Sequence, residues 1–454
     1  MNIVIAGAGE LGLMLAEKLT GNGHDVVLID SSVDTLEHIN DSLDVKLLEG
    51  SCADRHILER ANIRNADVLL AVSGDEASNI LACQLAARLG TRKTICRMNG
   101  SSFFAEQEQL TPESFGIWKH ISPPDECVRK IMAVLEDKYL LEEIRFSHPD
   151  AVMRVFEITP SSLISGTRIK DIPMDSALLA SIRFAAIARG KQFVIPHGDT
   201  LFVPGDRVYI AGTSEHVRDF IRWVSDDQAA PQASRIIIAG ATVTGTMLAQ
   251  SLARKGYDIR VIERSRHAGE KLSDVLPANV LVINGDPTDE DVQREAGVAQ
   301  CGAFIGATPD DENNILSCII AKQQGAGKTI SLTAKPEYIR IVPVMDMIDC
   351  GISSTLVAVN SILRMLETGT MRVDAYMQMY HAQLTEFRVS GSSPLCGRAL
   401  ASCKLPASTL FALLFRGGEV SAPSGGTVLQ PGDVVVAIVT PEMEKELAPL
   451  FPVR

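Results

Sequence analysis

The sequence predicts an α/β protein with two doubly wound parallel-sheet domains, each followed by a small α+β domain. Two observations support this fold class. Short apolar, β-branched runs alternate with helix-patterned stretches, which is typical of a parallel sheet covered by helices on both faces. The whole pattern then occurs a second time within the 454 residues. We therefore expect four domains in two tandem copies, with the boundaries 1–138, 139–228, 235–368 and 369–454.

The duplication is visible as a register that is kept over most of the chain. Four segments of the first copy return in the second at offsets between 227 and 235 residues, a period too long for a solenoid. The matched pairs are Ile3–Gly12 with Ile236–Gly245, Gly23–Asp30 with Gly256–Glu263, Ala71–Glu76 with Gly306–Asp311, and the R-G…P-G-D turns Arg189–Asp206 with Arg416–Asp433.

The expected elements follow from periodicity and turn residues. Five apolar runs predict the strands Ile3–Ala6, Asp25–Ile29, Val45–Leu48, Val68–Val72 and Thr94–Arg97. Helical spacing predicts helices at Leu11–Thr20, Ala77–Leu89 and Glu126–Lys138, the last aligned with Leu356–Glu367. In the small domain, glycine and proline turns separate the predicted strands Ser181–Ala188, Gln192–Ile195 and Arg207–Ala211. The polar segment 225–234 is the expected linker between the copies.

The net charge of the chain disfavours some classes of binding partner. Lys and Arg total 43 against 56 for Asp and Glu, a formal net charge of −13. An acidic chain without a long basic run is a poor candidate for binding nucleic acid or anionic lipid. The charge suits a protein that meets a basic partner.

Cysteine usage and hydropathy indicate a cytoplasmic protein. The nine cysteines are odd in number and form no C-x-x-C pair, and most lie in apolar stretches where a thiol is a small buried hydrophobe. The N-terminal residues have no basic region, so we expect no signal peptide. No apolar run approaches the length that a membrane span requires.

A glycine motif in the first copy predicts a nucleotide site and gives its domain a Rossmann-like character. Gly7-x-Gly9-x-x-Gly12 follows a strand and opens a helix, so that a pyrophosphate can approach the backbone N–H groups at the helix N-terminus. Asp30 ends the second strand, where a carboxylate accepts from both adenosine ribose hydroxyls. Because that charge repels a 2′-phosphate, NAD(H) or another adenine nucleotide is favoured over NADP(H).

The second copy departs from this motif at its middle glycine. Gly240 and Gly245 are kept and Glu263 supplies the acid, but Thr242 stands where the first copy has Gly9. A Cβ there crowds a pyrophosphate, although the hydroxyl could donate to a phosphate instead. Arg264 beside the acid complicates the electrostatics. A second nucleotide site and a degenerate structural copy both remain open.

Other candidates lie at the carboxyl ends of strands, the edge where open α/β sheets bind ligands. Ser73-Gly74 and Thr308 end the fourth strands, and Ser51 follows the third strand near the expected adenine side. The neighbouring Asp75 and Asp310 are equally consistent with helix caps. Arg97 ends the fifth strand and could reach phosphates or form a structural salt bridge; Leu332 replaces it in the second copy.

Patterns of catalysis are lacking in the sequence. The nine histidines show no H-E-x-x-H spacing, and there is no G-x-S-x-G elbow, so we expect neither a catalytic residue nor a metal site. The segment Gly325–Thr329 resembles the end of a phosphate-binding Walker loop, but Lys322 stands where that motif requires glycine. We reject this match and expect a protein that binds a nucleotide without turning it over.

Taken together, these residues resemble the TrkA family, the cytoplasmic NAD-binding regulatory subunits of prokaryotic Trk potassium uptake systems. Each half of the chain is similar to an RCK (KTN) domain, and the resemblance covers essentially the whole chain. On the family's nucleotide positions lie Gly7, Ala8, Gly9, Glu10, Leu11, Asp30, Ser73 and Arg97 in the first half. In the second half they are Gly240, Ala241, Thr242, Val243, Thr244 and Glu263.

The resemblance implies a regulatory function. The family's RCK units form a ring, here a homotetramer, on the cytoplasmic face of a TrkH/TrkG-type membrane subunit, and ligands such as NAD(H) and ATP or ADP shift its conformation. The acidic charge then predicts contact with a basic surface of that subunit. Two rivals stay open: a soluble NAD-dependent oxidoreductase, and an RCK scaffold whose sites are all vestigial.

Overall fold

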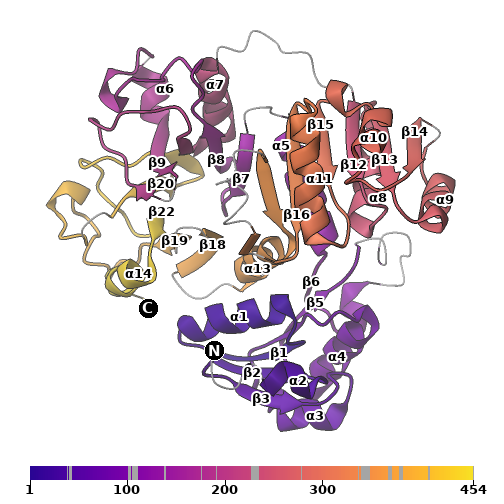
Figure 1. Cartoon of the computed structure of the whole chain (residues 1–454). Coiled ribbons are helices and arrows are strands. Elements are labelled where there is room, and N and C mark those ends of the chain that lie inside the picture. Colours follow the sequence, from indigo (N-terminus) through magenta and orange to yellow (C-terminus); the bar gives the residue numbers. More distant parts are fainter. Residues whose placement is uncertain are drawn as a thin grey trace.

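The computed structural model contains four β-sheets, arranged as two parallel-sheet domains and two small domains (Figure 1). The structure describes the chain except residues 38, 40–42, 101–103, 105–110, 137–139, 175, 191, 226–234, 278, 336, 339–347, 367–370, 378–381, 407–408 and 453–454. The predicted linker after residue 225 and the predicted boundaries at 138/139 and 368/369 fall outside the described residues, so the domain limits stay predictions.

The first sheet has six parallel strands in the order β3-β2-β1-β4-β5-β6. Its strands are β1 Asn2–Ala6, β2 Asp25–Asp30, β3 Lys46–Glu49, β4 Val68–Ala71, β5 Lys93–Arg97 and β6 Lys119–Ile121. Five of them confirm the predicted runs. The sixth was missed because its three residues include a lysine and a histidine and show no apolar run.

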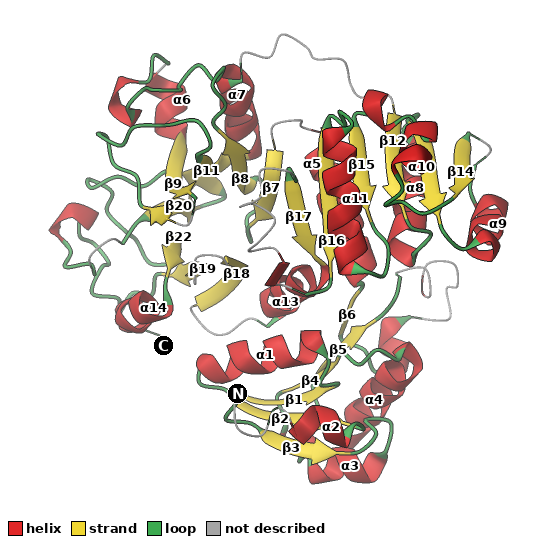
Figure 2. Cartoon of the chain, in the orientation of Figure 1, coloured by secondary structure: helices red, strands yellow, loops and turns green. Residues whose placement is uncertain are grey.

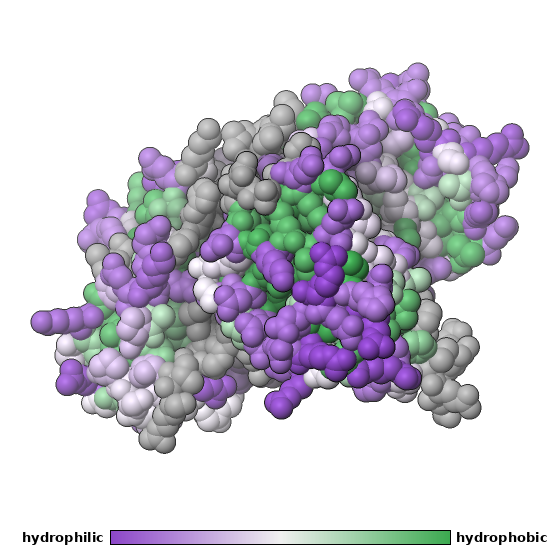
Figure 3. All heavy atoms as spheres, turned by 90° about the horizontal axis from the view of Figure 1, so that it is seen from below, coloured by the Kyte–Doolittle hydropathy of each residue, from purple (hydrophilic) through white to green (hydrophobic). Residues whose placement is uncertain are grey.

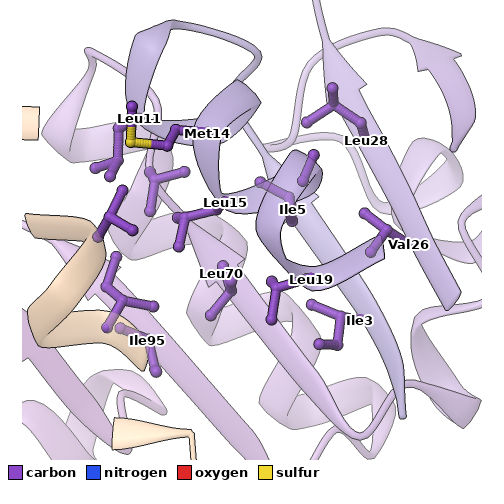
Figure 4. Close-up of a cluster of buried hydrophobic side chains, with 14 of the residues drawn as sticks. Ile3, Ile5, Leu11, Met14, Leu15, Leu19, Val26, Leu28, Leu70 and Ile95 are labelled. Atoms are coloured by element: carbon purple, nitrogen blue, oxygen red, sulfur yellow. The ribbon is translucent and has the colours of Figure 1, made fainter. Parts of the chain in front are cut away.

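Helices cover both faces of this sheet, as the doubly wound prediction requires (Figure 2). They are α1 Glu10–Gly21, α2 Val33–Glu37, α3 Arg55–Arg60 and α4 Glu76–Leu89. Alternate residues of β1 face opposite cores: Ile3 and Ile5 pack under α1, whereas Val4 packs with the α3 and α4 side. Figure 4 shows the first of these cores, where Leu15 and Leu19 of α1 point down onto the strands.

The second copy repeats this domain. Its parallel strands lie in the order β14-β13-β12-β15-β16-β17. They are β12 Arg235–Ala239, β13 Asp258–Glu263, β14 Val280–Asn284, β15 Ala303–Gly306, β16 Lys328–Thr333 and β17 Cys350–Ser353. The helices are α8 Val243–Arg254, α9 Arg266–Val275, α10 Glu290–Glu295 and α11 Asp311–Gln323.

Each small domain is built on a five-stranded antiparallel sheet. The first, in the order β10-β9-β11-β8-β7, has β7 Leu140–Arg145, β8 Ala151–Glu157, β9 Ile182–Arg189, β10 Gln192–Val194 and β11 Arg207–Thr213, with α6 Ser176–Ser181 and α7 Ser214–Val224. The second, in the order β18-β19-β22-β20-β21, has β18 Met371–Met377, β19 Ala382–Arg388, β20 Phe411–Arg416, β21 Glu419–Ser421 and β22 Val434–Val439, with α14 Pro441–Leu447. The three predicted strands are confirmed, while β7 and β8 were missed.

The crossover helices exchange places between the copies. Helix α5 (Pro123–Glu136) follows the first sheet, yet its Val128 and Ile131 are buried in the core of the second parallel-sheet domain. Helix α13 (Ser354–Met365) follows the second sheet, yet Val359 and Ile362 are buried in the core of the first parallel-sheet domain, where α13 contacts α1 and β6. The two helices also contact each other. Each parallel-sheet domain therefore completes its core with a helix from the other half of the chain.

The two small domains share a core as well. Met153 and Ala186 of the first sheet pack in one apolar cluster with Leu384 and Val436 of the second. At the border of this interface the backbone N–H of Ser147 donates to the buried carboxylate of Glu386 (2.6 Å). The chain thus folds as two intertwined halves with an internal pseudo-symmetry.

The surface is predominantly polar. Seen from below the orientation of Figure 1, hydrophilic residues border a central apolar area (Figure 3). None of the helices in the described part of the chain is both long and apolar enough to cross a bilayer. All nine cysteines are free thiols, and seven of them are buried, which confirms their expected place in the cores.

Candidate nucleotide-binding sites

The first β–α turn requires its outer glycines for steric reasons. Gly7 has φ of +110°, and a Cβ there would lie 2.6 Å from the backbone of Ser73. A Cβ on Gly12 would lie 1.8 Å from the carbonyl oxygen of Gly7, because α1 packs directly on the turn. These two positions shape the turn whether or not a ligand is bound.

The middle glycine is different, since its Cα faces open space. A Cβ on Gly9 would meet nothing within 4 Å. Gly9 is the N-cap residue of α1, and it provides no side chain to accept from the N–H groups of the first turn. Leu11 has its side chain in the core and Glu10 is exposed. The N-terminus of α1 therefore has free backbone N–H groups and open space, which is what the binding of a pyrophosphate requires.

Asp30 lies beside this turn at the end of β2. Its Oδ2 accepts from the backbone N–H of Ala8 (2.6 Å) and its Oδ1 accepts from that of Ser32 (2.8 Å). Each carboxylate oxygen has a second lone pair, so both remain able to accept from a ribose hydroxyl. The two backbone N–H groups fix the orientation of the carboxylate, and Asp30 is half-buried.

Ser73 is held by a buried residue that sequence reasoning missed. Asn79, 1% exposed, accepts from the backbone N–H (3.0 Å) and the hydroxyl (2.8 Å) of Ser73 through Oδ1. Its Nδ2 donates to the carbonyl oxygens of Ser73 and Arg97. The hydroxyl proton of Ser73 is therefore engaged within the protein, and Asn79 ties the ends of β4 and β5 together.

Arg97 extends from the end of β5 and is half-buried. Its Nη1 lies 3.5 Å from the carbonyl oxygen of Val72, and burial lowers the pKa of its guanidinium. Within the described residues Arg97 makes no ion pair, so the salt bridge that was its alternative explanation is not observed. A cation in this position lacks a counter-charge that an anionic ligand would supply.

The remaining first-copy candidates differ in what they contribute. Asp75 caps α4 by accepting from the backbone N–H of Ser78 (3.1 Å), and bonds from Ser78 lower the pKa of its carboxyl. The capping alternative is thus the observed one. Ser51 is exposed, and its hydroxyl accepts from the backbone N–H of Ala53 (3.2 Å). Gly74 has open space at its Cα.

The second copy reproduces the turn and the acidic residue. Gly240 has φ of +109°, and a Cβ on Gly245 would lie 2.2 Å from the carbonyl oxygen of Gly240. Glu263 accepts from the backbone N–H groups of Ala241 and Ser265, each at 2.7 Å. These contacts match those of Asp30 in the first copy.

The N-terminus of α8 is closed by its own side chain. Thr242 Oγ1 accepts from the backbone N–H of Gly245 (3.1 Å) and donates to the carbonyl oxygen of Ala307 (2.8 Å). The hydroxyl proton of Thr242, which the sequence suggests as a donor to a phosphate, is thus donated to a backbone carbonyl oxygen instead. Val243 and Thr244, the next two candidates, stand in the first turn of α8, with Val243 52% exposed.

A cavity of about 430 Å³ opens at this second site. Its lining comprises Gly240, Ile262, Glu263, Arg264, Ser265, Asp286, Pro287, Thr308, Pro309, Asp310 and Asn313. Arg264 and Asp286 of this lining form an ion pair. Burial by itself would raise the pKa of Asp286, but hydrogen bonds from the backbone N–H of Thr288 and from Arg264 outweigh it and lower that pKa. Asn314, 1% exposed, holds Thr308 as Asn79 holds Ser73.

The fold and these sites define a class of protein: a tandem pair of Rossmann-type domains with candidate ligand sites at the carboxyl edges of their sheets. Comparison with known sequences narrows the class. Residues 3–123 and 236–349 match the TrkA-N domain, and residues 153–225 and 384–451 match the TrkA-C domain. The chain therefore belongs to the TrkA family, and the predicted resemblance is confirmed.

Similar proteins cover the same length. The chain is 29% identical to Trk system potassium uptake protein TrkA homolog 1 of Methanosarcina mazei, over 98% of this chain and 99% of that protein. It is 28% identical to Trk system potassium uptake protein TrkA of Vibrio alginolyticus, over 99% and 98%. The GsuK RCK domain shares the fold with TM-score 0.61 and 17% identity, over 99% of this chain and 94% of that one. The GsuK channel bound to NAD aligns with the same score and identity, over 99% and 78%.

Proposed function

We propose that this chain is a cytoplasmic nucleotide-sensing regulatory subunit of a potassium uptake transporter. The observation that carries the proposal is the first site, where the oriented carboxylate of Asp30 lies beside the uncapped N-terminus of α1. A ribose and a pyrophosphate in one ligand match these two features. Arg97 adds a cation at the same edge.

The ligand of the first site is NAD(H), with ATP and ADP as competitors. All three contain an adenosine ribose whose hydroxyls can donate to Asp30, and all carry linked phosphates for the helix N-terminus. NADP(H) is disfavoured because its 2′-phosphate would face the same carboxylate. A solved GsuK channel bound to NAD and another bound to ADP share the fold and support this choice.

The exchanged helices connect the first nucleotide site to the second small domain. Because α13 belongs to the second half and packs on α1, a ligand at the N-terminus of α1 acts on a helix that leads into the second small domain. A ligand shifts the balance of two conformations by its difference in affinity for them. The chain thus acts through coupling, without redox turnover.

The partner is a TrkH/TrkG-type potassium-translocating membrane subunit, and the chain binds it as a homotetramer on the inner face of the membrane. The names of the related Trk system proteins support this assignment. The net charge of −13 suits a basic cytoplasmic surface on the partner. Binding to the partner should therefore weaken as salt is raised.

Calorimetry of the purified full chain tests the ligand. NADH, NAD⁺, ATP, ADP and NADPH are titrated into the unaltered protein and into Asp30→Ala. We expect NADH binding to weaken at least about tenfold in the variant, since hydrogen bonds to a charged group are lost. Asp67→Asn is the matched control, because Asp67 accepts from the backbone N–H of Asn2 at the opposite edge of the sheet.

Three results would contradict the proposal. NADH binding that is equal in Asp30→Ala and the unaltered chain would exclude the first site. Steady oxidation of NADH by the purified protein with a small substrate would favour the oxidoreductase. Failure of every nucleotide to bind would favour the vestigial scaffold.

A further inference from the structure

The second cavity keeps the ribose-binding end of the first site. Glu263 Oε2 and Oε1 each accept one backbone N–H, from Ala241 and Ser265, as the two oxygens of Asp30 do. Each oxygen can therefore accept once more, from a ribose hydroxyl. The cavity of about 430 Å³ lies within the range of small-molecule sites.

The phosphate-binding end is altered in its geometry. In the first copy Gly9 leaves the first turn of α1 without a side-chain acceptor and leaves its own Cα facing open space. In the second copy the hydroxyl of Thr242 takes up the backbone N–H of Gly245 and stands in the corresponding place. A phosphate at α8 would have to displace this cap, and the hydroxyl could donate to it only by leaving the carbonyl oxygen of Ala307.

The phosphate-binding end is altered in its charge as well. Leu332, 8% exposed, replaces the cation Arg97. The cavity is lined by three carboxylates, those of Glu263, Asp286 and Asp310, against the single guanidinium of Arg264. Since Arg264 is already paired with Asp286, its charge is compensated within the protein. The net field of the lining opposes an anion.

We propose that the second cavity binds an uncharged nucleoside and discriminates against nucleoside diphosphates and dinucleotides. The ribose hydroxyls donate to Glu263, and the described lining has no uncompensated cation to receive the phosphates. The inference rests on the proposed function in treating the chain as a nucleotide sensor, but it concerns a different site. One chain would then respond separately to a dinucleotide and to a nucleoside.

The test uses the full chain carrying Asp30→Ala, so that the first site is disabled. Adenosine, guanosine, cytidine and uridine are titrated by calorimetry, each alongside its 5′-diphosphate, with and without Mg²⁺. We expect at least one nucleoside to bind, and its diphosphate to bind at least about tenfold more weakly. Adding Glu263→Gln should weaken the nucleoside by a similar factor.

A second variant identifies the residues responsible. Thr242→Gly with Leu332→Arg restores the first-copy residues, and glycine at an N-cap costs only a few tenths of a kcal/mol. We expect the diphosphate to bind at least about tenfold more tightly in this variant than in its Asp30→Ala parent. If the double variant does not fold, Thr242→Gly alone is measured, with a smaller gain in the same direction.

The inference is overturned if no nucleoside binds, or if a diphosphate binds more tightly than its nucleoside with or without Mg²⁺. Its failure is separable from that of the proposed function. NADH binding to the Glu263→Gln chain, with the first site intact, tests the first site alone.

Discussion

The ammonium group of Lys328 donates to the carbonyl oxygen of Val134 at a distance of 3.0 Å, across 194 positions of the chain. Lys328 begins β16 of the second domain, and Val134 lies in the last turn of α5 from the first half. The same Nζ donates to the carbonyl oxygen of Leu140 (3.1 Å), where β7 begins. Lys328, which lies in the segment whose match to a Walker loop was rejected, thus holds α5 in the core of the second domain.

Replacing Lys328 should destabilise the junction between the halves. In Lys328→Met the carbonyl oxygens of Val134 and Leu140 lose a buried donor, and each unsatisfied group costs about 1–3 kcal/mol. Lys93→Met is the matched control, because Lys93 is the first-copy counterpart and lies over the exposed ring of Trp118 (4.9 Å). Chemical denaturation measures both; equal losses for the two variants would contradict the anchoring role.

Substitutions of two glycines in the first β–α turn should affect stability and NADH binding differently. Gly12→Ala places a Cβ at 1.8 Å from the carbonyl oxygen of Gly7, so we expect a loss of several kcal/mol of stability, as in other overpacked sites. Gly9→Ala meets no neighbour, so we expect a loss of only about 1 kcal/mol, because alanine is a poorer N-cap residue than glycine.

The same Gly9→Ala protein should bind NADH at least about tenfold more weakly, because the methyl group occupies the space expected for the pyrophosphate. Thermal melting measures the stability of Gly9→Ala, and calorimetry on the same preparation measures its affinity for NADH. Unaltered NADH binding by Gly9→Ala would place the phosphates elsewhere.

The exchanged helices predict which domain each core variant weakens. Ile131 of α5 and Ile362 of α13 are both 0% exposed. Truncation of either to alanine should cost about 2–5 kcal/mol. We expect Ile131→Ala to raise hydrogen exchange in β12–β16 and Ile362→Ala to raise it in β1–β5, since each helix completes the opposite core. If hydrogen exchange instead became faster only in the sheet that precedes each helix in sequence, α5 and α13 would not complete the opposite cores.

The R-G…P-G-D pattern should make the second small domain sensitive to acid. Burial by itself would raise the pKa of Asp433, but the hydrogen bonds from Arg416 and from the backbone N–H of Gln430 outweigh it and hold the pKa below its usual range. A carboxyl group with a lowered pKa stabilises the fold above its unfolded-state pKa of ~3.9, and this stability is lost as pH falls through its folded-state pKa.

We therefore expect stability to fall with acidification below about pH 4, and Asp433→Asn to remove that part of the pH dependence. The variant should also be less stable at neutral pH by about 1.5–3 kcal/mol, because hydrogen bonds to a charged group are lost. Denaturation followed by near-ultraviolet circular dichroism at several pH values measures both effects. An unchanged acid slope in Asp433→Asn would assign the acid sensitivity to other carboxylates.

Several site features could be read from sequence because they are local. The glycine spacing and Asp30 follow from the strand–turn–helix unit, in which close contacts leave few choices of residue. Asn79 could not be assigned in this way, since its role depends on the ends of β4 and β5 meeting around one buried amide. Its sole signal was the repetition of an asparagine, Asn314, at the matching position of the second copy.

The sequence by itself determined the fold class, the two copies and the parallel-sheet strands β1–β5, because periodicity and turn residues report on local structure and burial. The family was indicated by the resemblance of the motifs. Tertiary structure alone decided that α5 and α13 exchange domains, since an apolar helix face is equally compatible with either core. It also decided that Thr242 closes its helix: a threonine hydroxyl can cap or contact a ligand, and the position of Ala307 made it a cap.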